Sequence, residues 1–321
     1  MGLSLITGGA GFIGSNMVRF LLEKGQKVRV LDNFATGKRE NLAEVAGGST
    51  GSPLNRIELI EGDIRDMNAV RKSVANVDVV YHLAALGSVP RSVKDPLTSH
   101  DVNINGIVNM LIAARDAKVR RFIFSSSSSV YGQSKVLPQH EGLALAPISP
   151  YGATKAAGEI YCRTFYETYG LQTICLRYYN VFGPRQDPTS QYAAAIPLFV
   201  SALLRDKSPT IFDDGEQSRG FTYIENVMQA NWLAANVKET HGEAINISTK
   251  NAVTVNTVVN TIRKLLGKEN IKPVYAPPRP GDIKHSLADV KRAKEVIGYE
   301  PFVSFEEGIA KAINWYRENL K

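Results

Sequence analysis

The N-terminal stretch LSLITGGAGFIG (residues 3–14) joins an apolar run to a turn with glycines at positions 8, 11 and 14. The apolar run is typical of a buried strand, and the amphipathic sequence FIGSNMVRFLLEK (12–24) is typical of a helix. Glycines at this spacing permit a tight turn and let the backbone approach a pyrophosphate at the helix N-terminus. Tight turns also use glycine for backbone reasons alone, so the motif needs support from its surroundings.

A carboxylate downstream supplies that support. Asp32 closes the next apolar run, KVRVLD (27–32), 18 residues beyond Gly14. A carboxylate at this place accepts both hydrogen bonds of an adenosine ribose and repels a 2′-phosphate, which favours NAD over NADP. Lys38 and Arg39 lie close downstream and favour the alternative, NADP.

The first half of the chain alternates short β-branched runs with longer amphipathic stretches, the pattern of a parallel sheet covered by helices. The predicted strands are residues 3–8, 27–32, 57–63, 78–84, 121–126 and 172–178, and the predicted helices are residues 12–24, 97–117 and 151–170. We therefore predict an α/β fold with a doubly wound, Rossmann-like parallel sheet. Residues 47–53, GGSTGSP, are predicted to form a loop.

After about residue 180 the pattern changes to loops and helices interrupted by proline, such as AAAIPLFVSALLRDK (193–207). We predict a dinucleotide-binding domain over residues 1–179 and a smaller C-terminal α/β domain, mainly for the substrate, over residues 180–321. Residues 221–250 are predicted to pack back on the first domain. The two domains are therefore not separated at a single position in the sequence.

The composition excludes several classes of protein. The chain has 321 residues, 44% of them hydrophobic, which is enough for a large core. No apolar run approaches the about 18 residues that a membrane span requires, and the N-terminus lacks the regions of a signal peptide. Cys162 and Cys175 are too few for a disulfide framework and lack the spacing of metal ligands. We expect a cytoplasmic protein without a membrane partner or a metal site.

The net charge is +7, from 38 basic and 31 acidic residues. The basic residues fall in short mixed patches such as RDAKVRR (115–121) and DVKRAKE (289–295), which are typical of solvated helix faces. A long basic stripe with interleaved aromatic residues would indicate nucleic-acid binding. The charge pattern therefore favours an anionic small-molecule substrate, with no nucleic acid as a partner.

A second motif, Tyr151-Gly-Ala-Thr-Lys155, follows Pro150 at a predicted helix start. Tyr151 and Lys155 therefore lie on one face of the helix. A nearby ammonium and the helix N-terminus both favour the phenolate, so the tyrosine can act as a base near neutral pH. The alternative is a surface helix that carries both residue types by chance. The dinucleotide motif upstream favours the catalytic interpretation.

The serine run Ser125–Ser129 ends the fifth predicted strand and precedes Val130-Tyr131-Gly132. Ligands of open α/β sheets bind at the carboxyl ends of the strands. A serine hydroxyl at this end can share a proton with the substrate, although serine runs also occur in plain polar loops.

These features, together with RYYNVFGP (177–184), resemble the extended short-chain dehydrogenase/reductase family over essentially the whole chain. Within it the sequence is similar to nucleotide-sugar 4-epimerases of the UDP-N-acetylglucosamine 4-epimerase type. The similarity lies in AALGSVPRS (84–92), NVFGPRQDP (180–188), YAAAIP (192–197) and RPGDIKHS (279–286).

The resemblance implies a homodimeric isomerase that holds NAD and converts a UDP-hexose to its 4-epimer through a transient 4-keto sugar. It implies that Tyr151 takes and returns the O4 proton, that Ser127 steadies this proton, and that Lys155 holds the cofactor ribose and lowers the Tyr151 pKa. The cofactor-binding residues expected from motif and resemblance are Gly8, Gly11, Phe12, Ile13, Gly14, Asp32, Asn33, Gly37, Asp63, Ile64, Leu83, Ala84, Ala85, Asn103, Tyr151, Lys155 and Tyr178. The expected substrate-binding residues are Gly87, Ser88, Ser127, Ser128, Tyr151, Asn180, Ala194, Ala195, Phe212, Arg219, Arg279, Asp282 and Ser286.

Within this substrate set, the resemblance gives Phe212 a place near uracil and gives Arg219 and Arg279 the diphosphate. Guanidinium groups suit a diphosphate because they pair bidentately with its oxygens. Surface ion pairing is the alternative for both arginines. For Asp63, which the resemblance places near adenine, the alternative is a strand-end turn.

Two differences from related enzymes narrow the expected chemistry. Related 4,6-dehydratases and uronate decarboxylases have an acidic residue just before Val-Tyr-Gly, where this chain has Ser128 and Ser129. Elimination and decarboxylation are therefore disfavoured. Similar epimerases restricted to plain hexoses have a tyrosine in place of Ser286, and the smaller serine leaves room for an acetamido group. This predicts UDP-GlcNAc and UDP-GalNAc as preferred substrates, with UDP-Glc and UDP-Gal accepted more weakly. The alternative for Ser286 is a cap of a helix over residues 286–297.

Other functions stay open on the sequence. A UDP-glucuronate 4-epimerase needs no acid before Val-Tyr-Gly, although the Asn180 amide suits a neutral sugar better, and a 4-ketoreductase of the same family is a further alternative. A dinucleotide- or RNA-binding protein without activity is possible on the same fold. The presence of Ser127, Tyr151 and Lys155 argues against it, because a pure binder gains nothing from a tyrosine set up as a base.

Overall fold

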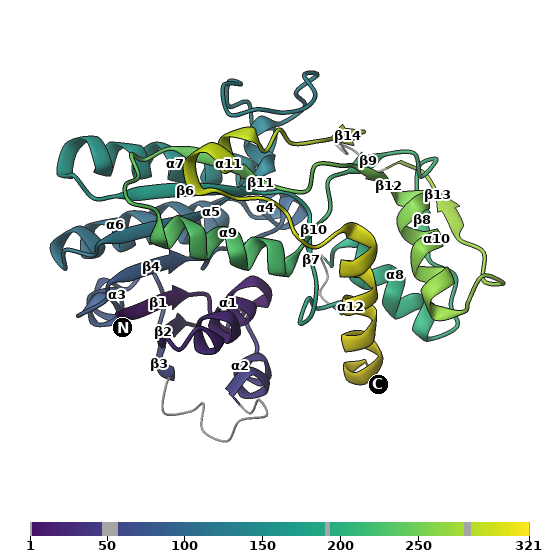
Figure 1. Ribbon diagram of the computed structural model, residues 1–321, viewed down its shortest axis with the longest axis horizontal. Helices are drawn as coiled ribbons and strands as arrows, with labels where there is room; N and C mark the ends of the chain where they lie inside the picture. The colour runs from purple at the N-terminus through teal and green to yellow at the C-terminus, as the bar shows by residue number, and fades with distance from the viewer. Residues whose placement is uncertain (1, 47–56, 190–192, 279–283, 321) are drawn as a thin grey trace.

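The computed structural model describes residues 2–46, 57–189, 193–278 and 284–320 (Figure 1). In this part of the chain, the largest sheet has seven strands in the order β11-β6-β5-β4-β1-β2-β3, and all its strand pairs are parallel. Its strands are β1 (Leu3–Thr7), β2 (Lys27–Asp32), β3 (Ile57–Glu61), β4 (Val79–His82), β5 (Arg121–Ser127), β6 (Thr173–Tyr178) and β11 (Ala244–Ile247). The strand order reverses between β1 and β4, so the predicted doubly wound sheet is confirmed. The predicted loop at 47–53 lies outside the described residues.

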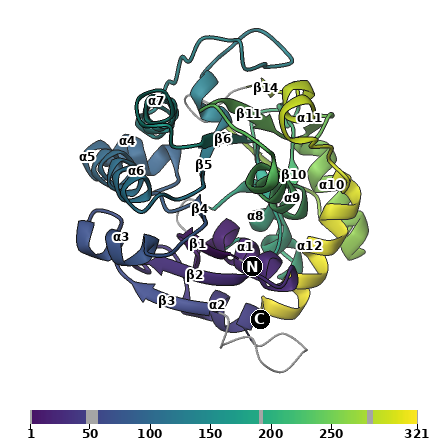
Figure 2. The same cartoon turned by 60° about the vertical axis from the view of Figure 1, so that its left-hand side comes forward.

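Helices cover both faces of this sheet (Figure 2). One face carries α1 (Phe12–Glu23) and α9 (Ile224–Asn236), and the other carries α3 (Met67–Val74), α6 (Gly106–Asp116) and α7 (Pro150–Tyr169). Successive side chains of a strand point to opposite faces, so Leu5 packs in one buried cluster and Ile6 in the other. Because both faces are covered, the inner strands are buried almost throughout, whereas the edge strand β3 is largely exposed.

The single helix predicted over residues 97–117 is wrong in one respect. The structure has α5 (Pro96–His100), a π-helical turn at Asp101–Asn105, and then α6. The turn directs Asn103 toward the loop after β4, where the Asn103 Oδ1 accepts a hydrogen bond from the Leu86 N–H at 2.8 Å. Widened turns of this kind often occur beside functional sites.

Beyond β6 the chain forms smaller sheets and helices, drawn at the right of Figure 1. These elements are β7 (Val181–Phe182), α8 (Ala195–Leu204), β8 (Thr210–Phe212), β9 (Ser218–Arg219), β10 (Thr222–Tyr223), β12 (Val253–Thr254), α10 (Val255–Leu266), β13 (Val274–Ala276), β14 (His285–Ser286), α11 (Lys291–Ile297) and α12 (Phe305–Asn319). The small sheets have the orders β12-β9-β14, β13-β8 and β10-β7. Most of them form an α/β unit beside the large sheet, whereas α11 packs on β11 and α9.

Two elements from the second half of the chain return to the first. Helix α9 packs on α1 and β5, and β11 pairs with β6 at the edge of the large sheet. The division at residue 179 stays a prediction. Among the described residues, each helix is too short or too polar to span a membrane.

Candidate active site

The first cavity lies beyond the carboxyl ends of β1 to β4 and has a volume of about 430 Å³. Among the predicted cofactor residues, its lining includes Gly8, Gly11, Phe12, Ile13, Gly14, Asp32, Asn33, Gly37, Asp63, Ile64, Leu83, Ala84 and Ala85. We refer to it as the cofactor cavity. It also includes Gly87, which was predicted to contact the substrate, and Arg65 and Ser125, which the sequence analysis missed.

The glycine turn forms one wall of this cavity. Gly8 has a φ of +70°, and a Cβ atom on Gly14 would lie 2.0 Å from the Gly8 carbonyl oxygen. Both positions therefore require glycine. Helix α1 begins directly after Gly11 without a side-chain cap, which leaves its first N–H groups for an anionic ligand such as a pyrophosphate.

The carboxylate of Asp32 lies beside this turn and is buried. Its Oδ2 accepts the Ala10 N–H at 2.8 Å, and its Oδ1 accepts the Phe34 N–H at 2.8 Å. A carboxylate has about four acceptor sites, so both oxygens retain a site for a ribose hydroxyl. These features fit the adenosine half of NAD.

The two cations near Asp32 are directed to other partners. The Lys38 ammonium forms an ion pair with Asp187 at 2.7 Å. Arg39 pairs with Glu61 and stacks on the Phe34 ring, 4.0 Å from its centroid. A 2′-phosphate would have to displace these carboxylates, so the arrangement favours NAD over NADP.

Asp63 is more than a turn residue. Its carboxylate accepts hydrogen bonds from Arg65 Nη2 and from Asn33 Nδ2, each at 2.8 Å. The hydrogen bond from Arg65 is the main cause that lowers the Asp63 pKa to about 2. The Arg65 N–H also donates to Asp63 Oδ1, as in a local turn. Asp63 thus combines the turn with an ion pair that fixes Asn33 at the cavity.

The predicted catalytic residues lie together at the ends of β5 and α7. The Ser149 hydroxyl caps α7 by accepting the Gly152 N–H at 3.1 Å, and Pro150 takes the first turn. Tyr151, in that turn, forms a side-chain hydrogen bond with Ser127. The Lys155 Nζ donates to the Ser125 carbonyl oxygen at 2.6 Å and lies 5.8 Å from the centre of the Tyr151 ring.

The expected lowering of the Tyr151 pKa by Lys155 is not seen. Burial raises the Tyr151 pKa, and the hydrogen bond with Ser127 opposes this rise only in part. Burial also lowers the Lys155 pKa to about 8. The physical reason is that the Lys155 ammonium is directed to Ser125 rather than to the phenol oxygen.

A buried ion pair lies behind these residues and was missed by the sequence analysis. Glu159, one helical turn beyond Lys155, accepts hydrogen bonds from Arg177 Nη2 at 2.6 Å, Arg177 Nε at 2.9 Å and the Ser126 hydroxyl at 2.5 Å. Arg177 Nη1 donates to the Tyr131 hydroxyl at 2.7 Å. Both charged side chains are about 5% exposed. The signal in the sequence was the spacing of Tyr151, Lys155 and Glu159 along one helix face.

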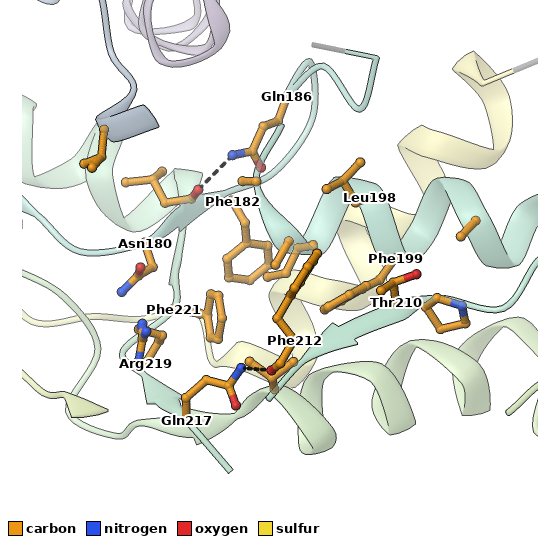
Figure 3. Close-up of a pocket in the computed structure, with 18 of the residues that line it drawn as sticks. Asn180, Phe182, Gln186, Leu198, Phe199, Thr210, Phe212, Gln217, Arg219 and Phe221 are labelled. Carbon is orange, nitrogen blue, oxygen red and sulfur yellow. Dashed lines mark hydrogen bonds between the residues drawn. The ribbon is translucent and has the colours of Figure 1, made fainter. Parts of the chain in front are cut away.

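The second cavity has a volume of about 700 Å³ and is lined in large part by α8 and β8 (Figure 3). Five predicted substrate residues line it: Asn180, Ala194, Ala195, Phe212 and Arg219. We call it the substrate cavity. Gln186, Gln217 and Phe221 line it as well and were not predicted. Val89 and Pro90, the first residues of α4 (Val89–Lys94), complete the side nearest Tyr151, whose N–H donates to Ser92 in that helix.

Polar and aromatic groups occupy different parts of the substrate cavity. Figure 3 shows Asn180 close to Arg219 at one end, with Phe212 and Phe199 further along. Arg219 Nη1 donates to the carbonyl oxygens of Ser218 and Lys284, both at 2.9 Å. The end with Arg219 suits an anionic group, and the aromatic end suits a planar base.

The predicted catalytic residues Ser127, Tyr151 and Lys155 line neither cavity, and the same holds for Ser88, Asn103, Ser128, Tyr178 and Ser286. The Ser88 hydroxyl caps α4, and Ser128 begins the short 3₁₀ turn after β5. Asn103 holds the Leu86 backbone and donates to the Thr154 hydroxyl of α7 at 3.1 Å. The Tyr178 hydroxyl is buried against Asn231.

Ser286 lies in β14, where it pairs with Arg219 of β9 and is buried. The alternative that Ser286 caps a helix is wrong, because α11 begins only at Lys291. Arg279 and Asp282 lie outside the described residues.

Comparisons with known proteins agree with this geometry. The family described as GDP-mannose 4,6 dehydratase matches residues 5–312. A UDP-glucose 4-epimerase of Mycolicibacterium smegmatis is 36% identical, with 98% of each chain covered. A UDP-N-acetylglucosamine 4-epimerase of Methanobrevibacter ruminantium, solved with UDP-N-acetylmuramic acid, is 40% identical over 99% of each chain, with a TM-score of 0.92. A UDP-glucuronic acid 4-epimerase of Bacillus cereus, solved with UDP-glucuronic acid and NAD, is 33% identical over 98% of this chain and 99% of that one, with a TM-score of 0.87.

Proposed function

Because this chain belongs to the GDP-mannose 4,6 dehydratase family of extended short-chain dehydrogenases/reductases, we propose that it is an NAD-dependent isomerase that inverts carbon 4 of UDP-hexoses. One observation carries the proposal. Lys155 is bonded to Ser125, which lines the cofactor cavity, and Tyr151 is bonded to α4, whose first residues line the substrate cavity. The acid–base group is therefore hydrogen-bonded to elements that line each of the two cavities.

The chain's own residues would hold the two ligands in fixed roles. Asp32 accepts the adenosine ribose hydroxyls, the N-terminus of α1 faces the pyrophosphate, and Lys155 binds the second ribose. NAD, when bound, supplies the acceptor and then the donor of the hydride at carbon 4 of the sugar. Arg219 anchors the UDP diphosphate, so the sugar can turn while the nucleotide stays in place.

The proton at O4 is handled by Tyr151 and Ser127. Tyr151 takes this proton as the sugar is oxidised to the 4-keto form, and Ser127, hydrogen-bonded to the phenol, stabilises the proton in transit. After the keto sugar has turned, Tyr151 returns the proton to O4 on the opposite face. The raised pKa of Tyr151 in the structure means that positive charge near the phenol is needed to form the phenolate.

Dehydration, which gives the family its name, is not proposed for this chain. It requires a further acid to protonate a leaving hydroxyl group. Serines 128 and 129 follow Ser127 directly in the 3₁₀ turn, where related dehydratases have an acidic residue. A serine hydroxyl is a poor proton donor compared with a carboxylic acid, so oxidation and re-reduction at carbon 4 are favoured.

For the sugar, we propose UDP-GlcNAc and UDP-GalNAc as preferred substrates, with UDP-Glc and UDP-Gal accepted more weakly. The support is the small side chain of Ser286 on a strand adjacent to Arg219, together with the similarity to a UDP-N-acetylglucosamine 4-epimerase. UDP-glucuronate is the second candidate substrate, supported by the similarity to the Bacillus cereus enzyme. The neutral amide of Asn180 in the cavity favours an uncharged sugar.

We further propose that the protein is a homodimer. Val93 of α4 is 64% exposed, Leu97 of α5 81% and Ile160 of α7 61%, and these three helices pack on one another. Large apolar side chains exposed on neighbouring helices are typical of a subunit interface. The homodimer, the cytoplasmic location and the absence of nucleic-acid binding stay predictions.

A panel of UDP-sugars tests the proposed function. Purified protein without added cofactor is incubated with UDP-GlcNAc, UDP-Glc and UDP-glucuronate, and the products are separated. We expect the fastest conversion from UDP-GlcNAc to UDP-GalNAc. Conversion of UDP-glucuronate alone would favour the second candidate, and no 4-epimer from any of the three would contradict the proposal.

A further inference from the structure

The segment Asn180–Asp187 has an unusual backbone for its position between the two cavities. Asn180 has a φ of +37° and Arg185 a φ of +66°, although neither is glycine. Side chains other than glycine rarely adopt this region, and such strain persists only where surrounding contacts impose it. The contacts of Arg185 and Asp187 supply that constraint.

Arg185 is a buried cation that the proposed reaction does not use. Its side chain is 1% exposed, and its guanidinium donates in three directions to the helices beside the cofactor cavity. Nε donates to the Ser15 hydroxyl at 3.1 Å, Nη2 to Asn16 Oδ1 at 2.5 Å, and Nη1 to Glu44 Oε1 at 2.8 Å. Asn16 in turn donates to the Pro184 carbonyl oxygen at 3.0 Å.

Ser15 and Asn16 belong to the first turns of α1, whose N-terminus borders the cofactor cavity. The Phe12 carbonyl oxygen accepts hydrogen bonds from both side chains, at 3.2 Å and 2.8 Å. Phe12 itself lines the cofactor cavity. Arg185 therefore fixes the segment that follows β7 to the helix start that faces the cofactor.

Asp187 makes a second connection to the same cavity through Lys38, at 2.7 Å. The Lys38 N–H donates to the Ala10 carbonyl oxygen at 3.0 Å, and the Ala10 N–H donates to Asp32. Gly37, directly before Lys38, lines the cofactor cavity. The Asp187 carboxylate is thus connected through Lys38 to Ala10 of the glycine turn.

The same segment forms part of the substrate cavity. Gln186 lies between Arg185 and Asp187, lines that cavity, and donates from Nε2 to the Val181 carbonyl oxygen at 3.2 Å (Figure 3). The Tyr316 hydroxyl of α12 donates to the Gln186 carbonyl oxygen at 2.9 Å. A shift of Gln186 therefore requires a shift of the contacts on α1 and on the loop at Lys38.

We propose that Arg185 and Asp187 are positioning residues that couple the two cavities, so that UDP in the substrate cavity slows the release of NAD. This rests on the proposed function. Coupling between two sites is reciprocal, so NAD also tightens the binding of UDP. It serves the reaction because the keto sugar must be reduced before the cofactor escapes.

The two connections differ in expected strength. Lys38 and Asp187 are 49% and 29% exposed, and pairs with such exposure have modest interaction energies. Arg185 is buried with three partners, so its replacement leaves Asn16 Oδ1 without its donor and leaves Glu44 Oε1 with the Trp315 indole N–H. Replacing Arg185 is therefore expected to reduce the coupling more than replacing Lys38 or Asp187.

The test measures NAD release from the purified holoenzyme into a solution that contains an NAD-consuming enzyme, with and without UDP. In the unmodified protein we expect UDP to slow the release. In Asp187→Asn and in Lys38→Met the slowing by UDP is expected to decrease about 2- to 5-fold, the range for an exposed ion pair. Arg185→Lys keeps the positive charge but loses the planar guanidinium that donates in several directions. In this variant we expect the slowing of NAD release by UDP to decrease about 10-fold or more.

Two further variants show whether a change in the slowing of NAD release by UDP reflects lost coupling or a general loss of structure. The charge-exchanged double variant Lys38→Asp/Asp187→Lys is expected to restore most of the slowing. Asp206→Asn breaks a comparable lysine–aspartate pair, Asp206–Lys268, whose residues line neither cavity, and is expected to leave the slowing unchanged.

The outcomes separate the inference from the proposed function. Equal slowing by UDP in the unmodified protein, Asp187→Asn, Lys38→Met and Arg185→Lys would overturn the inference and leave the function standing. No effect of UDP on the unmodified, NAD-loaded protein would do the same. A purified protein that carries no NAD would overturn both. If Arg185→Lys does not fold, the variants at Lys38 and Asp187 still give the result.

Discussion

The cofactor cavity and the substrate cavity differ in the parts of the chain that form them. The cofactor cavity is lined in large part by the turns that follow β1, β2, β3 and β4, and six of its lining residues are glycines, which present only backbone. The substrate cavity combines α4, the segment from Asn180 to Gln186, α8, and residues from Ser208 to Phe221. Its chemistry comes from side chains such as Arg219 and Phe212.

This difference has consequences for substitutions. A backbone wall depends on the strands that carry it and on the few positions where only glycine fits. A side-chain wall depends on individual groups, so one replacement removes one contact. The four residues Tyr151, Lys155, Ser127 and Glu159 line neither cavity and are expected to affect activity or stability.

The largest effect is expected at the buried ion pair below both cavities. Glu159→Gln removes the charge that pairs with Arg177 and leaves a buried guanidinium without compensation. Breaking a buried pair in this way costs about 3–5 kcal/mol, which we expect in the free energy of unfolding by denaturant titration. Glu167→Gln, on the same helix in an exposed pair with Arg163, serves as the control and should change stability by less than about 1 kcal/mol. A similar small change in both variants would show that the pair does not support the site.

The next largest effect is expected on kcat, at the proposed acid–base residue Tyr151. Tyr151→Phe removes the hydroxyl that takes the O4 proton, so kcat should fall at least about 100-fold. The affinities for NAD and UDP should stay close to those of the unmodified protein, since the ring remains. Tyr161→Phe, an exposed tyrosine of the same helix, is the matched control. Normal turnover in Tyr151→Phe would rule out the assigned base.

A smaller effect, on the affinity for UDP, is expected when one side chain of the substrate cavity is removed. Arg219→Ala should weaken UDP binding by about 1.5–3 kcal/mol, the range for hydrogen bonds to charged groups. Uridine lacks the diphosphate, so its affinity should change little. Calorimetric titration of both ligands measures the difference. An equal loss for UDP and uridine would place Arg219 away from the diphosphate.

A smaller, pH-dependent effect is expected in the sheet beneath the cofactor cavity. His82 of β4 is buried, bonded to the Thr7 hydroxyl at 2.9 Å, and burial lowers its pKa from 6.5 to about 3. Between these values the unfolded chain binds a proton that the folded chain does not, so stability falls as pH falls below about 6.5. The slope approaches about 1.4 kcal/mol per pH unit for one proton.

Denaturant titrations at pH 7 and pH 5 measure this slope. In His82→Gln, which cannot take up a proton, the loss of stability between the two pH values should be smaller than in the unmodified protein. His100→Gln removes an exposed histidine and should keep the full loss. The same loss in His82→Gln and in the unmodified protein would contradict the assignment.

The contrast between the cavities also explains what the sequence could predict. The glycine turn, Asp32 and the Tyr151–Lys155 motif are short stretches whose spacing follows directly from strand and helix geometry. Six of the seven strands of the large sheet were predicted from short β-branched runs, whereas β11 was not predicted as a strand.

Contacts between distant segments were not predictable in this way. Arg177 meets Glu159 only because β6 lies beside α7, and Gln186 and Gln217 reach the substrate cavity through the folding of separate loops. The helix considered over residues 286–297 forms only from Lys291, because Ser286 pairs with β9 as part of β14. Likewise the Tyr151 pKa depends on burial and on where the Lys155 ammonium points, neither of which spacing reveals.

In the proposed reaction, the hydride removed from carbon 4 returns to the same carbon while NAD stays bound. UDP-GlcNAc carrying deuterium at carbon 4 tests this directly, with purified protein, no added NAD, and an excess of unlabelled NADH in solution. We expect UDP-GalNAc that retains the deuterium at carbon 4, measured by mass spectrometry and NMR. Product that has lost the deuterium, or no UDP-GalNAc at all, would contradict it.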